Sequence, residues 1–223
     1  MSDLAIYDLD RTLTRRATYT PFLLHCALGR APWRLLLLPL VIASMLLYVA
    51  RIIDRGRLKE INHRLLLGRW IHPKDLKPLV DSFADATVAH NIRPGARKAI
   101  DRDKHEGRRL VLATASYRLY ADAIADRLGF DDVIGTGSVI GLDERIRSRI
   151  HGENAYGEAK LRMIAEWVEK SGLTGKHGHV RFYSDHASDE PTFEWADEPV
   201  AVNPHARLAR LAIRRGWPIE NWG

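Results

Sequence analysis

The chain has 223 residues, of which 46% are hydrophobic and 28% are charged, and its net charge is +6. This composition excludes a disordered or fibrous protein and suffices for one domain with a sizeable core, or one domain that carries an insertion. Cys26 is the only cysteine, so no internal disulfide can form, a cytoplasmic setting suits the chain, and we expect Cys26 to be a small packing residue. The acidic amino terminus enters the first expected strand directly, so we predict no signal peptide.

The first expected strand is the short apolar run Leu4-Ala5-Ile6-Tyr7, and Asp8 and Asp10 follow where it ends. In open α/β sheets, ligands bind at the carboxyl ends of the strands. Two acids at such an edge can divide the work of phosphoryl chemistry: one attacks phosphorus, while the other protonates the leaving oxygen and then activates water. A solvated acidic turn is the alternative for so short a pattern.

The basic excess is confined to one segment. Residues 11–77 hold 13 lysines and arginines against three acids, a net of +10, so the remainder of the chain carries a net of −4. The same segment is the most hydrophobic part of the sequence, and its basic residues are not interleaved with aromatic ones. This pattern does not indicate a nucleic-acid partner.

Residues 35–50 are apolar, uncharged and bracketed by arginines. A helix of this length spans roughly 24 Å, less than the ~30 Å hydrocarbon core, and Pro39 should kink it. A single crossing would also separate Asp8 from every later motif. We therefore expect a membrane-associating helix at about 33–53 that lies in the interface or re-enters, paired with the apolar run 21–28, on an anionic membrane surface. Burial in a helical cap or an oligomer interface is the alternative, and the oligomeric state stays open.

Two helices interrupted by Pro73 and Pro78 are expected over residues 64–88, and Pro94 should open a helix that runs to Gly107. The second buried strand is then expected over residues 109–116.

That strand ends in Thr114 and Ser116 and leads into a helix over residues 117–128. A hydroxyl at such a strand-to-helix turn, beside backbone N–H groups, makes an anion site. A plain helix cap is the alternative for either residue. A third short strand at 131–136 and a β-hairpin over 138–150, turning at 141–143, should follow.

Lys160 begins the next expected helix, and the strand 180–185 then delivers Asp185, with Asp189 four residues later at a helix start. Carboxylates without nearby cysteines suit Mg²⁺, which keeps several waters and bridges to a phosphate. A transition metal held by histidines is the less favoured alternative. These histidines are His177, His179 and His186. We expect the chain to close with a strand at 199–203, a basic helix at 205–215 and an apolar tail at 217–222.

Taken in order, Asp8-x-Asp10-x-Thr12, Thr114, Lys160 and Asp185-x-x-x-Asp189, each at an expected strand or helix end, resemble the haloacid dehalogenase-like (HAD) hydrolase superfamily. Each piece alone is weak, but the ordered set is specific and spans nearly the whole chain. The insertion between the first two motifs resembles the helical C1 cap of subclass IB, which includes phosphoserine phosphatases. The resemblance implies a Rossmann-like α/β core with a mostly parallel sheet flanked by helices, at 1–14 and 91–223, and a helical cap at 15–90.

The resemblance also implies roles for individual residues. Asp8 would be the nucleophile that forms an aspartyl-phosphate, and Asp10 the general acid and base. Thr114 and Lys160 would bind the phosphate, and Arg11 and Ser116 are candidate substrate contacts. Mg²⁺ would be held by Asp8, by the backbone carbonyl of Asp10 and by Asp185, with Asp189 supporting the metal shell.

Two departures from the family pattern bear on the substrate. Arg11 stands where a glycine is common, and Ala17 stands where phosphoserine phosphatases carry a glutamate for the substrate amino group. Arg15 and Arg16 are cationic and would repel an ammonium, so phosphoserine itself is disfavoured.

The long apolar helix makes the cap resemble, more loosely, phosphatidylglycerophosphatase C and related membrane phosphatases. We therefore expect a Mg²⁺-dependent phosphomonoesterase at the cytoplasmic face of the membrane, acting on a phospholipid-type substrate such as phosphatidylglycerophosphate. The alternative is a soluble cytoplasmic phosphatase for small phosphomonoesters, such as phosphoserine-like metabolites. A non-catalytic membrane-binding module is a third reading.

Overall fold

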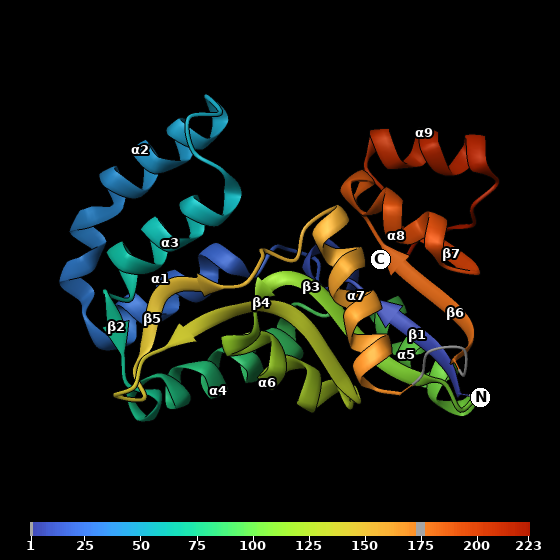
Figure 1. The fold of residues 1–223 in the computed structure, drawn as a ribbon, viewed down its shortest axis with the longest axis horizontal. Helices are drawn as coiled ribbons and strands as arrows, with labels where there is room; N and C mark the ends of the chain where they lie inside the picture. Colours follow the sequence, from blue (N-terminus) through green and yellow to red (C-terminus); the bar gives the residue numbers. More distant parts are fainter. Residues whose placement is uncertain (1, 173–176) are drawn as a thin grey trace.

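The computed structural model describes residues 2–172 and 177–223, and its centre is a mixed eight-stranded sheet in the order β2-β5-β4-β3-β1-β6-β7-β8 (Figure 1). Six neighbouring strands are parallel, whereas β5 is antiparallel to β4 and β2 is antiparallel to β5. The strands are β1 (Ser2–Tyr7), β2 (Trp70–Ile71), β3 (Arg109–Tyr117), β4 (Asp132–Ile140), β5 (Ile146–His151), β6 (His177–Ser184), β7 (Glu198–Val202) and β8 (Ile219–Glu220). The predicted α/β fold with a mostly parallel sheet is confirmed.

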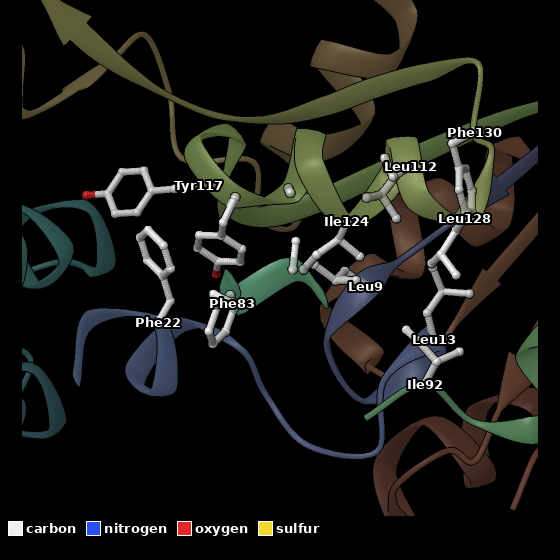
Figure 2. Packing of buried hydrophobic residues seen from close by; sticks show 14 of the residues in the cluster. Leu9, Leu13, Phe22, Phe83, Ile92, Leu112, Tyr117, Ile124, Leu128 and Phe130 are labelled. Carbon is white, nitrogen blue, oxygen red and sulfur yellow. The ribbon is translucent and has the colours of Figure 1, made fainter. Parts of the chain in front are cut away.

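Both faces of the parallel part of the sheet are covered by helices, as a continuous apolar strand requires. Ala5 and Tyr7 pack with α5 (Pro94–His105) and α6 (Arg118–Leu128), whereas Leu4 and Ile6 pack on the opposite face. That face is covered by α7 (Glu158–Lys170), α8 (Glu190–Trp195) and α9 (Ala206–Arg215). Figure 2 shows the first of these clusters, which extends from the sheet into the inserted helices.

The position of β1 determines where a ligand can bind. β1 lies between β3 and β6, with Leu4 paired to Arg109 on one side and to Val180 on the other. The chain leaves β1 towards β3 in one direction and reaches β6 in the other, so the strand order reverses there. Such a switch point opens a crevice at the carboxyl ends of the strands, directly beyond Tyr7.

The segment between β1 and β3 is helical, but two expected boundaries were wrong. α3 begins at Arg55, ahead of the expected residue 64, because Asp54 caps it by accepting a hydrogen bond from the Arg57 amide at 2.7 Å. Pro78 does not interrupt α4, whose apolar face is buried on both sides of it, and Pro73 stands in the first turn. The inserted helices are α1 (Tyr19–Arg30), the 3₁₀-helix Pro32–Leu37, α2 (Leu38–Val49), α3 (Arg55–Leu66) and α4 (Pro73–His90).

The apolar segment lies on the surface of this insert. Within α2 only Val41 and Ser44 are buried, and Leu36 in the preceding 3₁₀-helix is 81% exposed. The helix type changes from 3₁₀ to α near Pro39. By length and composition Pro32–Val49 is long and apolar enough to cross a membrane, which is weak support for a span.

The expected pairing partner of this segment, residues 21–28, lies in α1. α1 packs against α3, α4 and the 3₁₀-helix and buries Phe22 and Cys26 within the core of the insert.

The insert leaves and rejoins the rest of the chain at one point. Thr14 and Ile92 form an isolated antiparallel bridge, and the Arg15 amide donates to the Asn91 carbonyl at 2.8 Å. Inside the insert, α4 packs against α6 of the main body. We keep residues 15–90 as the proposed cap.

The carboxyl-terminal half follows the expected order of elements. The third strand continues beyond residue 136 to Ile140 and forms the expected hairpin with β5, in which the Glu144 amide donates to the Gly141 carbonyl at 2.9 Å. The expected apolar tail contains a further strand, because Ile219 pairs with Ala201 of β7.

Candidate active site

A tight turn at the end of β1 presents Asp8 at the crevice. The Asp8 amide donates to the Tyr183 carbonyl of β6 at 2.9 Å, and the Thr14 amide donates back to the Leu9 carbonyl at 3.0 Å. Within this turn Arg11 has a φ of +66°, the left-handed conformation in which glycine carries no steric penalty. This backbone requirement gives a physical reason for the glycine that is common at this position in the family.

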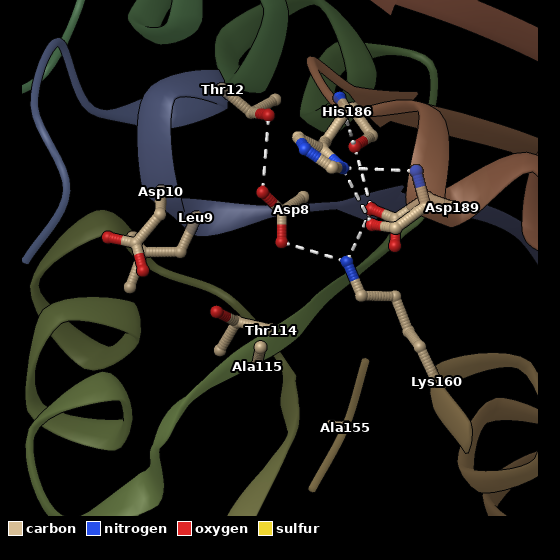
Figure 3. A network of polar contacts seen from close by, with 12 residues as sticks. Asp8, Leu9, Asp10, Thr12, Thr114, Ala115, Ala155, Lys160, His186 and Asp189 are labelled. Carbon is tan, nitrogen blue, oxygen red and sulfur yellow. Dashed lines mark hydrogen bonds and ion pairs between the residues drawn. The ribbon is translucent and has the colours of Figure 1, made fainter. Parts of the chain in front are cut away.

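Lys160 joins two carboxylates from separate elements, one at the end of β1 and one in the 3₁₀-helix Ala187–Asp189. Its ammonium donates to Asp8 Oδ1 at 2.9 Å and to Asp189 Oδ2 at 2.6 Å, and all three side chains are buried (Figure 3). Ser184 holds the same Asp189 oxygen at 2.7 Å. Burial opposes the charge of Lys160, but Asp189 and Asp8 outweigh it and raise the pKa of the ammonium above its ordinary value.

Thr12 brings Asp185 next to Asp8. Its hydroxyl lies 3.3 Å from Asp8 Oδ2 and 3.4 Å from Asp185 Oδ1, and it accepts a hydrogen bond from the Asp185 amide at 3.0 Å. Burial, with the neighbouring carboxylates, raises the pKa of Asp8 to about 7. Burial likewise raises the pKa of Asp185 to about 6. Burial is the main cause of both shifts, and the charge of Lys160 acts against it.

The donor set fits Mg²⁺. Asp8, Asp185 and Asp189 set three carboxylates against the one ammonium of Lys160, and Asp189 Oδ1 is buried without a hydrogen-bond partner among the described residues. Within residues 2–172 and 177–223, no group of three histidine, cysteine, aspartate or glutamate side chains is arranged to hold a metal by itself. Mg²⁺ does not need such a group, because it binds through one or two carboxylates, waters and a substrate phosphate.

The histidine side chains that the structure describes do not form a metal site of their own. The side chain of His177 lies outside the described residues, and His179 faces Glu198 at 3.7 Å. The ring centroids of His186 and His205 lie 4.3 Å apart, and His205 Nε2 is 3.9 Å from Asp185 Oδ2. No motif in the sequence pointed to His205.

Asp10 is held apart from the Asp8–Lys160–Asp189 chain. One of its oxygens accepts from the amide and the hydroxyl of Thr18 at 2.6 and 2.7 Å, and the other accepts from the Ser116 hydroxyl at 2.7 Å. Ser116 therefore contacts the expected acid and base, and its contact with substrate stays a prediction. Thr114 accepts from the Ser116 amide at 3.0 Å.

A cavity of about 310 Å³ opens at this edge of the sheet. The expected site residues on its wall are Asp8, Asp10, Arg11, Thr114, Lys160, Asp185 and Asp189. The cap contributes Ala17 and Arg55, and the Arg55 guanidinium lies 4.1 Å from the ring centroid of Tyr156. Sequence reasoning missed Thr18, Arg55 and Tyr156, because none of them belongs to a motif at a strand end.

Two carboxylates that share a buried lysine at the carboxyl edge of a parallel sheet suit a hydrolase that transfers a phosphoryl group to aspartate. The model of the haloacid dehalogenase-like hydrolase family matches residues 5–194, and the chain belongs to this family. Within it the chain is a phosphatase, in agreement with the phosphatases among its relatives.

Three known proteins show the range of similarity. The histidinol-phosphatase of Neisseria meningitidis serogroup C (strain 8013) is 29% identical over 161 residues, which is 72% of each chain. A solved structure of a protein with unknown function from Bordetella pertussis Tohama I has a TM-score of 0.90 and 25% identity over all of both chains. A phosphoserine phosphatase with an analogue of the phospho-aspartyl intermediate has a TM-score of 0.61 and 15% identity, covers 98% of this chain and 92% of its own, and shows similarity of fold.

Proposed function

We propose that this protein is a cytoplasmic, Mg²⁺-dependent phosphatase for a small phosphomonoester. The observation that carries the proposal is that Asp8, Asp10, Lys160 and Asp185 line one cavity of about 310 Å³, a size suited to a small molecule. The cavity lies at the switch point of the sheet, and part of its wall comes from the cap.

The geometry supports a two-step reaction. In the first step Asp8 attacks phosphorus, the bond from phosphorus to the leaving oxygen breaks, and Asp10 gives its proton to that oxygen. In the second step Asp10 takes a proton from the water that attacks the aspartyl-phosphate, so Asp8 is regenerated and phosphate is released. Lys160, 2.9 Å from Asp8 Oδ1, neutralises charge beside the phosphoryl oxygens, and the Thr114 hydroxyl binds them. Mg²⁺ would be held by Asp8, Asp185 and the Asp10 carbonyl and would supply further charge neutralisation.

The cap side of the cavity does not favour an ammonium group. Ala17 lines the cavity, and no acid lines it apart from the four aspartates of the proposed chemistry. Arg15 and Arg16 are exposed and do not line it, so the repulsion that we expected from them is not supported. Arg55 takes their place as the cation near the substrate.

A second candidate is a phosphomonoesterase that acts on a lipid phosphate at an anionic membrane surface. The observation that favours it is the exposed apolar surface of the 3₁₀-helix and α2, on which Leu36 is 81%, Leu46 64% and Val49 75% exposed. Contiguous apolar surface of this kind marks a membrane or protein contact.

The catalytic proposal is tested with Asp8→Asn, assayed by phosphate release from a panel of small phosphomonoesters with Mg²⁺ or EDTA. Wild type should release phosphate only with Mg²⁺, and Asp8→Asn should lose on the order of 10⁴-fold in kcat. The matched control is Asp101→Asn, an exposed aspartate of α5, which should behave as wild type. Full activity of Asp8→Asn would contradict the proposal.

The two candidates are separated by sedimentation with vesicles of anionic lipid and by light scattering. A small-molecule phosphatase should remain in the supernatant and hydrolyse soluble esters faster than phosphatidylglycerophosphate in micelles. Sedimentation that Leu36→Ser abolishes, with lipid turnover, would favour the lipid candidate. Leu142→Ser, at the fully exposed tip of the hairpin, is the control. A dimer that Leu36→Ser dissociates would assign the same surface to a second copy of the chain.

A further inference from the structure

A second cavity of about 300 Å³ lies beside the catalytic one and shares part of its wall. The shared residues are Asp10, Tyr19, Thr20, Arg55 and Ala115. Because Asp10 lies at the junction and would protonate the leaving oxygen, the second cavity is where the leaving alcohol of the substrate would lie. This step rests on the proposed phosphatase function.

Apolar side chains and two cations of the cap form the far wall of this second cavity. Met45, Tyr48 and Leu58 supply apolar surface, and Lys59 and Arg55 supply positive charge. Against these two cations the wall carries one acid among the described residues, Asp10. The leaving-group cavity therefore carries net positive charge.

Lys59 is the most unusual of these residues, because a lysine is seldom buried without a carboxylate partner. Its side chain is 4% exposed, and its ammonium donates to the Ala115 carbonyl and, at 2.6 Å, to Asn154 Oδ1. Within the described part of the chain it forms no ion pair with a carboxylate. Burial, together with Arg55, lowers the pKa of Lys59 to about 7, as expected for a cation that lacks a compensating anion.

Asn62 lies one turn further along α3 and faces the same way as Lys59. Its side chain is 1% exposed, and its Oδ1 accepts a hydrogen bond from Ser44 at 2.8 Å. Its Nδ2 has no hydrogen-bond partner of good geometry among the described residues, and the Tyr19 hydroxyl is the polar group beside it. A buried amide donor without an acceptor is costly, so the cavity wall offers a donor as well as a cation to an incoming group.

We infer that Lys59 and Asn62 select a substrate whose leaving alcohol carries a second anionic group and no ammonium, joined to the phosphoester oxygen by a short apolar stretch. A carboxylate or a second phosphate would supply the negative charge that the Lys59 ammonium lacks and the acceptor that Asn62 Nδ2 lacks. Met45 and Leu58 would contact the intervening carbons. A soluble acid or the diester phosphate of a lipid headgroup could present this chemistry.

The test compares three phosphate monoesters of similar size, those of 3-hydroxypropanoate, butan-1-ol and 3-aminopropan-1-ol. Wild type should show kcat/KM highest for the carboxylate ester and lowest for the ammonium ester, with a ratio of about 10- to 100-fold between them. Phosphatidylglycerophosphate in micelles is a fourth arm, and a higher kcat/KM for it than for the carboxylate ester would make the lipid the source of the anion.

Two variants assign the preference to these side chains. Lys59→Met should lower the carboxylate-to-butyl ratio of kcat/KM about tenfold or more, and the isosteric Asn62→Asp should shift preference towards the ammonium ester. Lys74→Met, an exposed lysine of the cap, is the matched control and should leave all ratios unchanged.

The outcomes separate this inference from the proposed function. No turnover of any ester with Mg²⁺ would defeat the phosphatase proposal itself. Turnover of all three esters in wild type, with the ammonium ester equal to or better than the carboxylate ester, would overturn the inference and leave the phosphatase proposal standing. Because this ranking is measured on wild type, it decides the matter even if Lys59→Met does not fold.

Discussion

The carboxyl edge of the sheet buries charged side chains, whereas the outer surface of the cap exposes apolar ones. At the sheet edge, Asp8, Lys160 and Asp189 are buried, and each is bound by a named partner. On the cap, Leu36 and Val49 are 81% and 75% exposed, and beneath them Asn62 keeps an unpartnered donor. The sheet edge pairs most of its buried charges with one another and leaves Asp189 Oδ1 for a bound cation, whereas the cap leaves both apolar surface and an amide donor to be covered.

This difference divides the work of the enzyme between the two regions. The sheet positions Asp8 through the bond of its amide to the Tyr183 carbonyl, and Thr12 holds Asp185 beside it, so the chemistry depends on the central strands β1 and β6. The cap presents Lys59 and Asn62 from one helix to whatever group is attached to the phosphate. We expect changes at the edge to affect turnover and stability together, and changes in the cap to affect selectivity.

The largest effect should follow Lys160→Ala. Its loss leaves Asp8 and Asp189 buried without their cation, so we expect a loss of about 3–5 kcal/mol in the free energy of unfolding. We expect a loss of roughly 10²–10³-fold in kcat as well. Urea unfolding and phosphate release measure the two effects. Lys170→Ala, in the last turn of the same helix, removes only an exposed pair with Glu166 and is the control. A Lys160→Ala protein as stable and active as the control would contradict this account of the site.

Truncation of an apolar side chain should have a larger effect on stability in the sheet than on the cap surface. Phe182 of β6 is fully buried, and Phe182→Ala should lower the free energy of unfolding by about 3–5 kcal/mol. Leu36→Ala, on the exposed cap surface, should change it by less than about 0.5 kcal/mol in the monomer. Both are measured by urea unfolding at low protein concentration. If Leu36→Ala lowered the free energy of unfolding strongly at high protein concentration but not at low concentration, a second copy of the chain would cover this surface.

The burial of Asp8 and Asp185 at the sheet edge predicts a pH dependence. The pKa values of Asp8 and Asp185 are raised from 3.8 to about 7 and about 6 in the folded chain. The folded state therefore binds these protons more tightly than the unfolded state, and the contribution of the two groups to stability falls as the pH rises from about 4 to about 7. Without Mg²⁺, Asp185→Asn should unfold at a higher temperature than wild type at pH 8. The Tm should rise by about 2–4 °C for each kcal/mol gained in the free energy of unfolding.

The pH dependence of the Tm of wild type and of Asp185→Asn tests the direction of this effect. The difference in Tm between Asp185→Asn and wild type should shrink as the pH approaches 4, where the carboxyl is protonated in both states of wild type to a growing extent. Mg²⁺ at pH 8 should stabilise wild type more than Asp185→Asn, because the ion binds the folded state through this carboxylate. A Tm difference that is independent of pH would show that the carboxylate charge is not the cause.

The smallest effect concerns the turn that carries the nucleophile. Arg11→Gly removes the left-handed strain at φ +66° but adds freedom to the unfolded chain, so stability should change by less than about 1 kcal/mol. Thermal unfolding measures this. Arg11 also lines the catalytic cavity, so a raised KM with unchanged kcat would identify it as a substrate contact. Equal KM values for the two proteins would assign it to the turn alone.

Sequence patterns predicted the sheet edge well, because each motif residue ends an apolar strand or begins a helix. Thr12 is an example: the motif contained it, but only the fold shows that it joins Asp8 to Asp185. Lys59 could not have been identified, because its burial results from the packing of α3 against the strand end at Ala115, across 56 residues of chain. The predicted start of α3 was wrong for a local reason. Asp54 is the N-cap residue of this helix, but the helix that follows it has few apolar residues to indicate its beginning.

The bridge between Thr14 and Ile92 has a consequence for how such enzymes diversify. The chain enters the insert at Thr14 and returns from it at Ile92, and these two points lie side by side. An inserted segment therefore needs only to begin and end there, and the strand that carries Asp8 need not move. Loop-closure entropy rises only slowly with the length inserted there, so exchange of the whole module is thermodynamically inexpensive. Evolution, or a designer, could graft a foreign lid at this junction and retarget the hydrolase, provided that the new segment holds Asp10 as Thr18 does.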